Sequence, residues 1–187
     1  RQTLSARHTS KFMMTRNLGI IQPGRLGDII ICLPIAKWYF DHGYKVTWPI
    51  HKALLKNFIG YIDYVDFIGI STLDCNEARK VCLSNCNTIL DLSITLPGSN
   101  PVNDRFFLAN KDRMTFDQMK YLFANVPFAE KWNLKFDRNF EAEQDLERKC
   151  LRDFENFSLV HYRGSAESFS YKYPPNESVI FVDELST

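Results

Sequence analysis

Short apolar runs alternate with longer helix-like segments through the first half of this chain, and that alternation restricts its fold more than any other feature. The apolar runs have the length of buried strands and are LGIIQ (18–22), KVTWPI (45–50), VDFIGI (65–70) and TILDLSI (88–94). The segments between them have the length and spacing of helices and cover 28–43, 51–61 and 73–85. Such alternation requires crossover connections between strands. It therefore predicts an α/β fold with a doubly wound, mainly parallel sheet.

The second half of the chain predicts fewer elements and a domain boundary. The turn-rich stretch TLPGSNPVNDR (95–105) is expected to form a long loop. Further helices are predicted at 115–126, with Thr115 as N-cap, and at 139–157. An extended connector is expected at 127–138, and strands at 158–165 and 177–185. The expected organisation is a tail over 1–15, a domain over 16–138, and a linker helix with the beginning of a second domain over 139–187.

Composition excludes several classes of partner. A formal net charge of +1 over 187 residues provides no overall field to attract nucleic acid or an anionic membrane. No apolar run approaches the ~20 residues that a membrane span needs. The odd number of cysteines, 5, favours reduced thiols and a cytoplasmic location. Their spacing matches no zinc pattern, so no metal site is predicted.

The segment QPGRLGDIIICLP (22–34) joins the first strand to the first helix and carries the clearest functional signal. A dinucleotide fingerprint would need G-x-G-x-x-G and an acid at the end of the second strand, and the chain has G-x-x-G-D and no such acid. Asp28 can instead be a cap or first-turn residue that opposes the helix dipole. It can also be a general base, kept ionised with a low pKa by the helix end. Spacing alone leaves these two interpretations open.

The segment GIIQPGRLGDIIICLPIAKWYFDHGYKVTWPI resembles the start of the heptosyltransferase-like glycosyltransferases, the family of the ADP-heptose:lipopolysaccharide heptosyltransferases. The likeness is carried by a strand, a loop ending in Gly27 and Asp28, and a helix start with Leu33 and Pro34. It continues in YIDYVDFIGI and TILDLSITLPGS, and it covers residues 17–100 well and 115–165 loosely.

The resemblance implies the GT-B fold, in which two Rossmann-like halves face a cleft. The N-terminal half would hold a sugar or glycan acceptor, and the other half a nucleotide-sugar such as an ADP-sugar, without metal or cofactor. Asp28 would be the base in inverting transfer, with Gly24, Arg25 and Gly27 shaping the acceptor pocket. LVHYRGSAESFS would begin the donor half, so the family also implies donor contacts, at His161, Gly164 and Ser165.

The chain ends soon after that segment, so we expect a truncated second half and a protein that is incomplete or inactive by itself, unless a homodimer or partner completes the cleft. Four other residues are candidates for acceptor binding, each with a structural alternative: His51 (helix cap), Asp91 (Asx turn), and Ser99 and Asn100 (plain turn). The alternative functions are a non-catalytic module that binds a glycan or sugar phosphate, and a small nucleotide-binding Rossmann protein.

Overall fold

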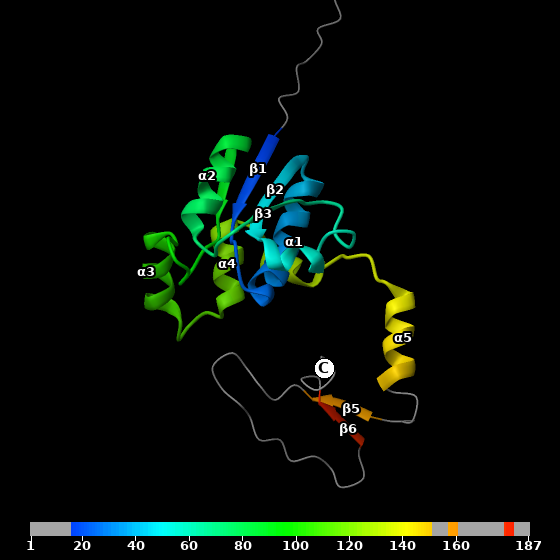
Figure 1. The fold of residues 1–187 in the computed structure, drawn as a ribbon. Coiled ribbons are helices and arrows are strands. Elements are labelled where there is room, and N and C mark those ends of the chain that lie inside the picture. Colours follow the sequence, from blue (N-terminus) through cyan, green and yellow to red (C-terminus); the bar gives the residue numbers. More distant parts are fainter. Residues whose placement is uncertain (1–15, 151–156, 161–177, 182–187) are drawn as a thin grey trace, which may run out of the picture. The chain divides into compact units, whose positions relative to one another are not determined.

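The computed structural model describes residues 16–150, 157–160 and 178–181, and its contacts divide into two compact units (Figure 1). The first unit ends at Asp137 and the second begins at Arg138. The expected tail over 1–15 lies outside the described residues. Among the residues that are described, no helix is both long and apolar enough to cross a bilayer.

A four-stranded, all-parallel sheet forms the centre of the first unit (Figure 1). Its strands are β1 (Arg16–Ile21), β2 (Tyr44–His51), β3 (Asp66–Ile70) and β4 (Thr88–Asp91), in the order β3-β2-β1-β4. This order is that of the first four strands in a Rossmann sheet. The prediction of an α/β fold with a parallel sheet is therefore confirmed.

Helices cover both faces of this sheet. Helices α1 (Leu26–Asp41) and α4 (Phe116–Ala124) share one apolar core with β1 and β2, in which Ile20, Ile29 and Tyr121 are buried. Helix α2 (Cys75–Asn85) covers the other face with Ala78 and Cys82. It approaches so closely that a Cβ on Gly19 would lie 2.7 Å from the Cys82 Cβ, so only glycine fits there.

Helix α1 tolerates a proline inside it. A proline beyond the first turn usually kinks a helix or delays its start, but α1 begins at Leu26 and runs through Pro34 to Asp41. Proline removes the N–H that would bond the carbonyl of Ile30. Ile30 is itself partly exposed, with a relative exposure of 40%.

Two predicted irregular segments contain helix. The expected loop over 95–105 gives way to α3 (Pro101–Asn110), whose N-cap is Asn100 and whose first residue is proline. The expected extended connector contains a 3-10 helix, η2 (Phe128–Trp132), and the helix predicted at 51–61 is another 3-10 helix, η1 (Lys52–Asn57). The predicted N-cap Thr115 is confirmed, and it forms a capping box with Gln118.

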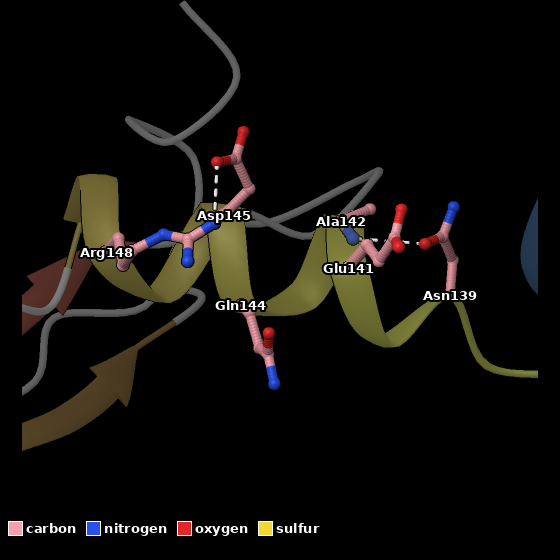
Figure 2. Close-up of a pocket in the computed structure, with 6 residues that line it drawn as sticks. All are labelled: Asn139, Glu141, Ala142, Gln144, Asp145 and Arg148. Carbon is pink, nitrogen blue, oxygen red and sulfur yellow. Dashed lines mark hydrogen bonds and ion pairs between the residues drawn. The ribbon is translucent and has the colours of Figure 1, made fainter.

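The second unit contains α5 (Phe140–Cys150) and a parallel strand pair, β5 (Phe157–Val160) and β6 (Ser178–Phe181). A hollow of about 580 Å³ runs along α5, and Figure 2 shows its lining. All six lining residues belong to α5 or its N-terminal flank, and Asp145 accepts a hydrogen bond from Arg148 at 3.2 Å. Because one helix supplies the whole lining, we interpret the hollow as a solvated helix face.

Candidate functional site

The point where the strand order reverses lies between β1 and β4, and the loop that leaves β1 there leads to Asp28. From β1 the chain turns toward β2 on one side, whereas β4 returns on the other side of β1. Ligands of open α/β sheets bind outside the carboxyl ends of the strands at such a point. Asp28 lies in the first turn of α1 and is half-buried, so its carboxylate is accessible at this edge.

A buried polar chain lies beneath Asp28. Gln22, which directly follows β1, is fully buried, and its Nε2 donates to the Gly24 carbonyl at 3.0 Å and to Asp28 Oδ2 at 3.4 Å. Its Oε1 accepts from Lys120 Nζ at 2.6 Å. Lys120, on α4, is also fully buried and donates to the carbonyl of Leu92, just after β4. The chain therefore links the ends of β1 and β4.

The pKa of Asp28 differs from the predicted one. Its pKa is raised, because burial penalises the carboxylate more than Lys120 and Arg25 stabilise it. The expectation of a low pKa was wrong because it considered the helix end and omitted desolvation. In the same environment, burial lowers the pKa of Lys120, while Cys32 and Asp28 oppose that shift. The two groups are held close together in surroundings that disfavour charge.

The loop between β1 and α1 owes its shape to Arg25 more than to its glycines. Arg25 is the helix N-cap and has φ 61° and ψ 117°, a backbone conformation that L-residues rarely adopt. Gly24 and Gly27 both have ordinary φ. At Gly24 a Cβ would lie 2.3 Å from Leu73 Cδ2, so a larger residue there would require the Leu73 side chain to shift. Strained residues of this kind cluster at functional sites, where the surrounding structure holds them.

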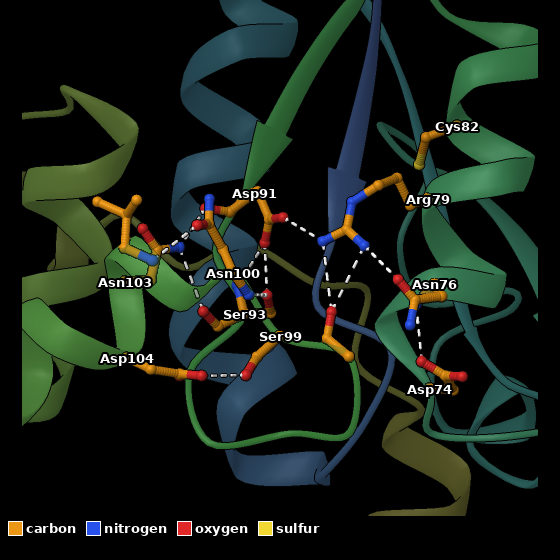
Figure 3. Close-up of polar contacts among 12 residues, drawn as sticks. Asp74, Asn76, Arg79, Cys82, Asp91, Ser93, Ser99, Asn100, Asn103 and Asp104 are labelled. Carbon is orange, nitrogen blue, oxygen red and sulfur yellow. Dashed lines mark hydrogen bonds and ion pairs between the residues drawn. The ribbon is translucent and has the colours of Figure 1, made fainter.

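The loop after β4 is a closed hydrogen-bond network, shown in Figure 3. Asp91 pairs with Arg79 of α2 at 2.8 Å, and its other oxygen accepts from the Ser93 backbone N–H at 3.1 Å. Asn103 of α3 donates to the carbonyls of Asp91 and Ser93 at 2.9 and 3.2 Å. Asn100 donates through its backbone N–H to the Ser93 hydroxyl at 3.2 Å. These groups hold α2 and α3 against the end of β4.

The predicted acceptor residues of this loop therefore all have partners within the protein. Asp91 forms the Asx turn that was its structural alternative. Asn100 caps α3 by accepting from Val102 N–H at 3.0 Å, and the Ser99 hydroxyl donates to Asp104 at 2.5 Å. The structure brings these three residues together with one another, on the β4 side of the edge.

His51 likewise has a structural role. Its Nδ1 accepts from Ala53 N–H at 3.3 Å and caps η1, the alternative considered from sequence. Its own backbone N–H donates to the Pro23 carbonyl at 2.8 Å, which ties the end of β2 to the loop before Asp28. The predicted donor residues His161, Gly164 and Ser165 lie outside the described residues.

Two other features of the described residues, a second hollow and the cysteines, provide no further candidate site. A hollow of about 330 Å³ at the C-terminal half of α1 is lined by Trp38, His42 and charged residues of η2 and its flank, and its Lys37 pairs with Asp41 at 2.5 Å. The cysteines from 32 to 86 are free thiols. Within the described ranges, no three His, Cys, Asp or Glu side chains come together as a metal site would require.

Sequence reasoning missed Gln22, Lys120 and Arg79. A signal for Lys120 exists in FDQMKYLFA, because it lies four residues from both Phe116 and the buried Ala124, on the apolar side of that helix. A lysine at such a position is almost never fully buried without partners, so it indicates a polar chain below the surface. Gln22 and Arg79 follow ordinary patterns and gave no signal.

Comparisons with protein-family models, with curated proteins and with solved structures found no significant match to this chain.

Proposed function

We propose that the first unit is the acceptor half of an inverting, metal-independent glycosyltransferase in which Asp28 is the general base. The observation that carries this proposal is the position of Asp28: a half-buried carboxylate in the first turn of α1, where the strand order reverses. The sequence resemblance of residues 17–100 to heptosyltransferase-like glycosyltransferases gives the same assignment.

The raised pKa of Asp28 suits this role. A general base is most effective when its pKa lies nearer to the working pH, so desolvation makes Asp28 a stronger base than an ordinary aspartate. In the proposed step, the acceptor hydroxyl oxygen forms a bond to the anomeric carbon of the donor sugar. The bond from that carbon to the nucleoside diphosphate breaks, the diphosphate leaves with the electron pair, and the hydroxyl proton passes to Asp28. A single displacement inverts the anomeric centre.

The loop around Asp28 leaves its surface open to an acceptor. Arg25, Leu26 and Gly27 are exposed around the half-buried carboxylate. In this proposal, the Arg25 guanidinium and the backbone from Gly24 to Gly27 contact the acceptor. The nucleotide-sugar, for which an ADP-sugar is the family's example, would contact His161, Gly164 and Ser165 of the second unit.

The test is a transfer assay with the whole chain. The chain is incubated with ADP-, UDP- and GDP-sugars and a library of sugar-phosphate and glycan acceptors, and products are detected by mass spectrometry. We expect one donor–acceptor pair to give product and Asp28→Asn to reduce its rate by about 10²–10⁴-fold. Asp41→Asn, at the other end of α1, is the matched control and should retain the rate.

Full activity of Asp28→Asn on that pair would refute the assignment of Asp28 as base. Acceptor binding without product from any donor would favour the non-catalytic binding module instead. Binding of a dinucleotide to the first unit, with no acceptor binding, would favour the nucleotide-binding alternative.

A further inference from the structure

We propose that Lys120 is a positioning residue for Asp28 and that it acts through the side-chain amide of Gln22. The inference rests on the proposed function of Asp28 only for its catalytic meaning, because the contact chain itself belongs to the fold. The chain runs from Lys120 Nζ to Gln22 Oε1 at 2.6 Å, and from Gln22 Nε2 to Asp28 Oδ2 at 3.4 Å.

The chemistry of the three groups fixes the direction of this chain. A lysine ammonium group only donates hydrogen bonds, so it selects the oxygen of the Gln22 amide. The NH₂ group of the amide is then directed to the opposite side, where it meets two acceptors, the Gly24 carbonyl and the Asp28 carboxylate. With the amide reversed, its NH₂ would face Lys120 and its oxygen would face the carboxylate. Lys120 therefore holds Gln22 as a donor toward Asp28.

Lys120 cannot act on a substrate directly. Its side chain has 0% relative exposure, its Nζ also donates to the Leu92 carbonyl, and it lies 4.6 Å from the centroid of the Phe116 ring. Its influence must pass through the groups that surround it. Gln22 accepts a hydrogen bond from Lys120 and also donates to Asp28, so it connects the two side chains.

Charge adds to the positional effect. Lys120 stabilises the carboxylate of Asp28, and so does Arg25 from the loop, whereas burial opposes ionisation. Around Lys120 the other titratable groups are Cys32 of α1, Cys75 of α2 and Asp91 of β4. Removal of the Lys120 charge should therefore raise the pKa of Asp28 further and move the acid limb of a transfer-rate profile to higher pH.

The test is an NMR titration of the full chain that follows the aspartate carboxyl carbons and the glutamine side-chain amides. In the unsubstituted protein we expect the Gln22 amide signals to shift with the same midpoint as the Asp28 carboxyl. In Lys120→Met we expect the titration midpoint of the Asp28 carboxyl to shift to higher pH. We also expect the Gln22 side-chain amide to populate both orientations instead of the one that directs its NH₂ group to Asp28. Lys131→Met is the matched control, since Lys131 pairs with Asp117, and should leave the midpoint unchanged.

Gln22→Glu provides a second variant in case Lys120→Met does not fold. It keeps an acceptor for Lys120 and places a second carboxylate beside Asp28, so the Asp28 midpoint should also rise. The proposal is overturned if the Gln22 amide signals of the unsubstituted protein do not shift when Asp28 titrates. It is also overturned if the Asp28 midpoint is unchanged in either variant that folds.

These readouts do not require catalysis. If the Gln22 and Asp28 titrations are coupled but no sugar transfer is found, the role of Lys120 in positioning Asp28 is supported and the assignment of Asp28 as a catalytic base is refuted. Transfer that depends on Asp28, with uncoupled titration, would leave the base and remove the role of Lys120.

Discussion

Two loops at the same edge of the sheet use polar residues in opposite ways. In the loop after β4, the polar groups form hydrogen bonds and ion pairs within the protein: Asp91, Ser93 and Asn100 bond to one another or to neighbouring helices. The loop after β1 holds its polar partners, Gln22 and Lys120, below the surface and leaves Asp28 half-exposed above them, with one long hydrogen bond at 3.4 Å.

This difference separates a structural acid from a candidate catalytic one. Asp91 and Asp28 both lie at the carboxyl edge of the sheet, and sequence spacing treats them alike. Asp91 has a charged partner and a backbone N–H that occupy both of its oxygens. Asp28 has a weak contact, a raised pKa and exposed neighbours, so it retains capacity to accept a proton from outside the protein.

The largest expected effect is the loss of Asp91. Asp91→Ala leaves the Arg79 guanidinium and the Ser93 N–H without their acceptor, so the free energy of unfolding should fall by about 2–3 kcal/mol in urea denaturation. Asp66→Ala is the matched control, because Asp66 forms an exposed strand ion pair with Lys45 at 3.8 Å. That control should lose less than about 0.5 kcal/mol. Equal losses in both variants would mean that the network around Asp91 is not closed.

A glycine in each loop gives the next contrast. Gly98 has φ 66° and no room for a Cβ beside Asp74 and Asn76, so Gly98→Ala should lower the free energy of unfolding by about 2 kcal/mol. Gly27 lies inside α1, and a Cβ there would meet nothing within 4 Å. Gly27→Ala should therefore raise stability by roughly 0.5–1 kcal/mol through helix propensity. Thermal unfolding of both variants checks the signs, and a shared sign would contradict the contrast.

Relief of backbone strain in the open loop should be smaller. Arg25→Gly removes the cost of φ 61° and ψ 117° and should raise the free energy of unfolding by about 1 kcal/mol. Asn125→Gly is the control, since Asn125 has φ 51° and ψ 41°, a left-handed conformation that asparagine tolerates, and should change stability by only a few tenths. A loss of stability in Arg25→Gly, measured by urea denaturation, would show that the loop is not strained.

The smallest expected effect is on Asp28 itself and depends on pH. Because the pKa of Asp28 is raised by folding, its stabilising contribution is complete below the ordinary value of 3.8 and is lost as pH rises through the folded-state pKa. Asp28→Asn does not titrate, so it should be more stable than the unsubstituted protein at pH 7 and should gain less stability at pH 3.5. Urea denaturation at both pH values checks this. A less stable Asp28→Asn at pH 7 would contradict the burial of this carboxylate.

Local patterns predicted much of the fold. The strand–helix alternation over residues 18–94 located every strand of the sheet, and Thr115 was identified as a cap because its partner, Gln118, is three residues away. Helix α3 was missed because Asn100 and Pro101 were taken as turn residues, although asparagine at the N-cap followed by proline is also a helix start. The correct prediction at Thr115 and the missed start of α3 both concern signals from residues that are close together in the sequence.

The candidate site was only partly predictable. The order of elements was enough to place Asp28 at the carboxyl edge, because a parallel sheet carries the helix that follows β1 away from that end. The sequence did not indicate that the positive φ of this loop belongs to Arg25 and that Gly24 and Gly27 do not have one. The sequence also did not distinguish residues of the β4 loop that form hydrogen bonds within the protein from residues that remain available to a ligand.

The sequence by itself determined the parallel α/β architecture, the Thr115 helix cap and the position of Asp28, since each follows from short-range pattern and the order of elements. Tertiary structure decided the direction of the pKa shift of Asp28 and the pairing of Asp91 with Arg79 of α2. The physical reason is that desolvation and hydrogen-bond partners come from distant residues: Gln22 and Lys120 are 98 positions apart, and they meet only when α4 covers the ends of β1 and β4.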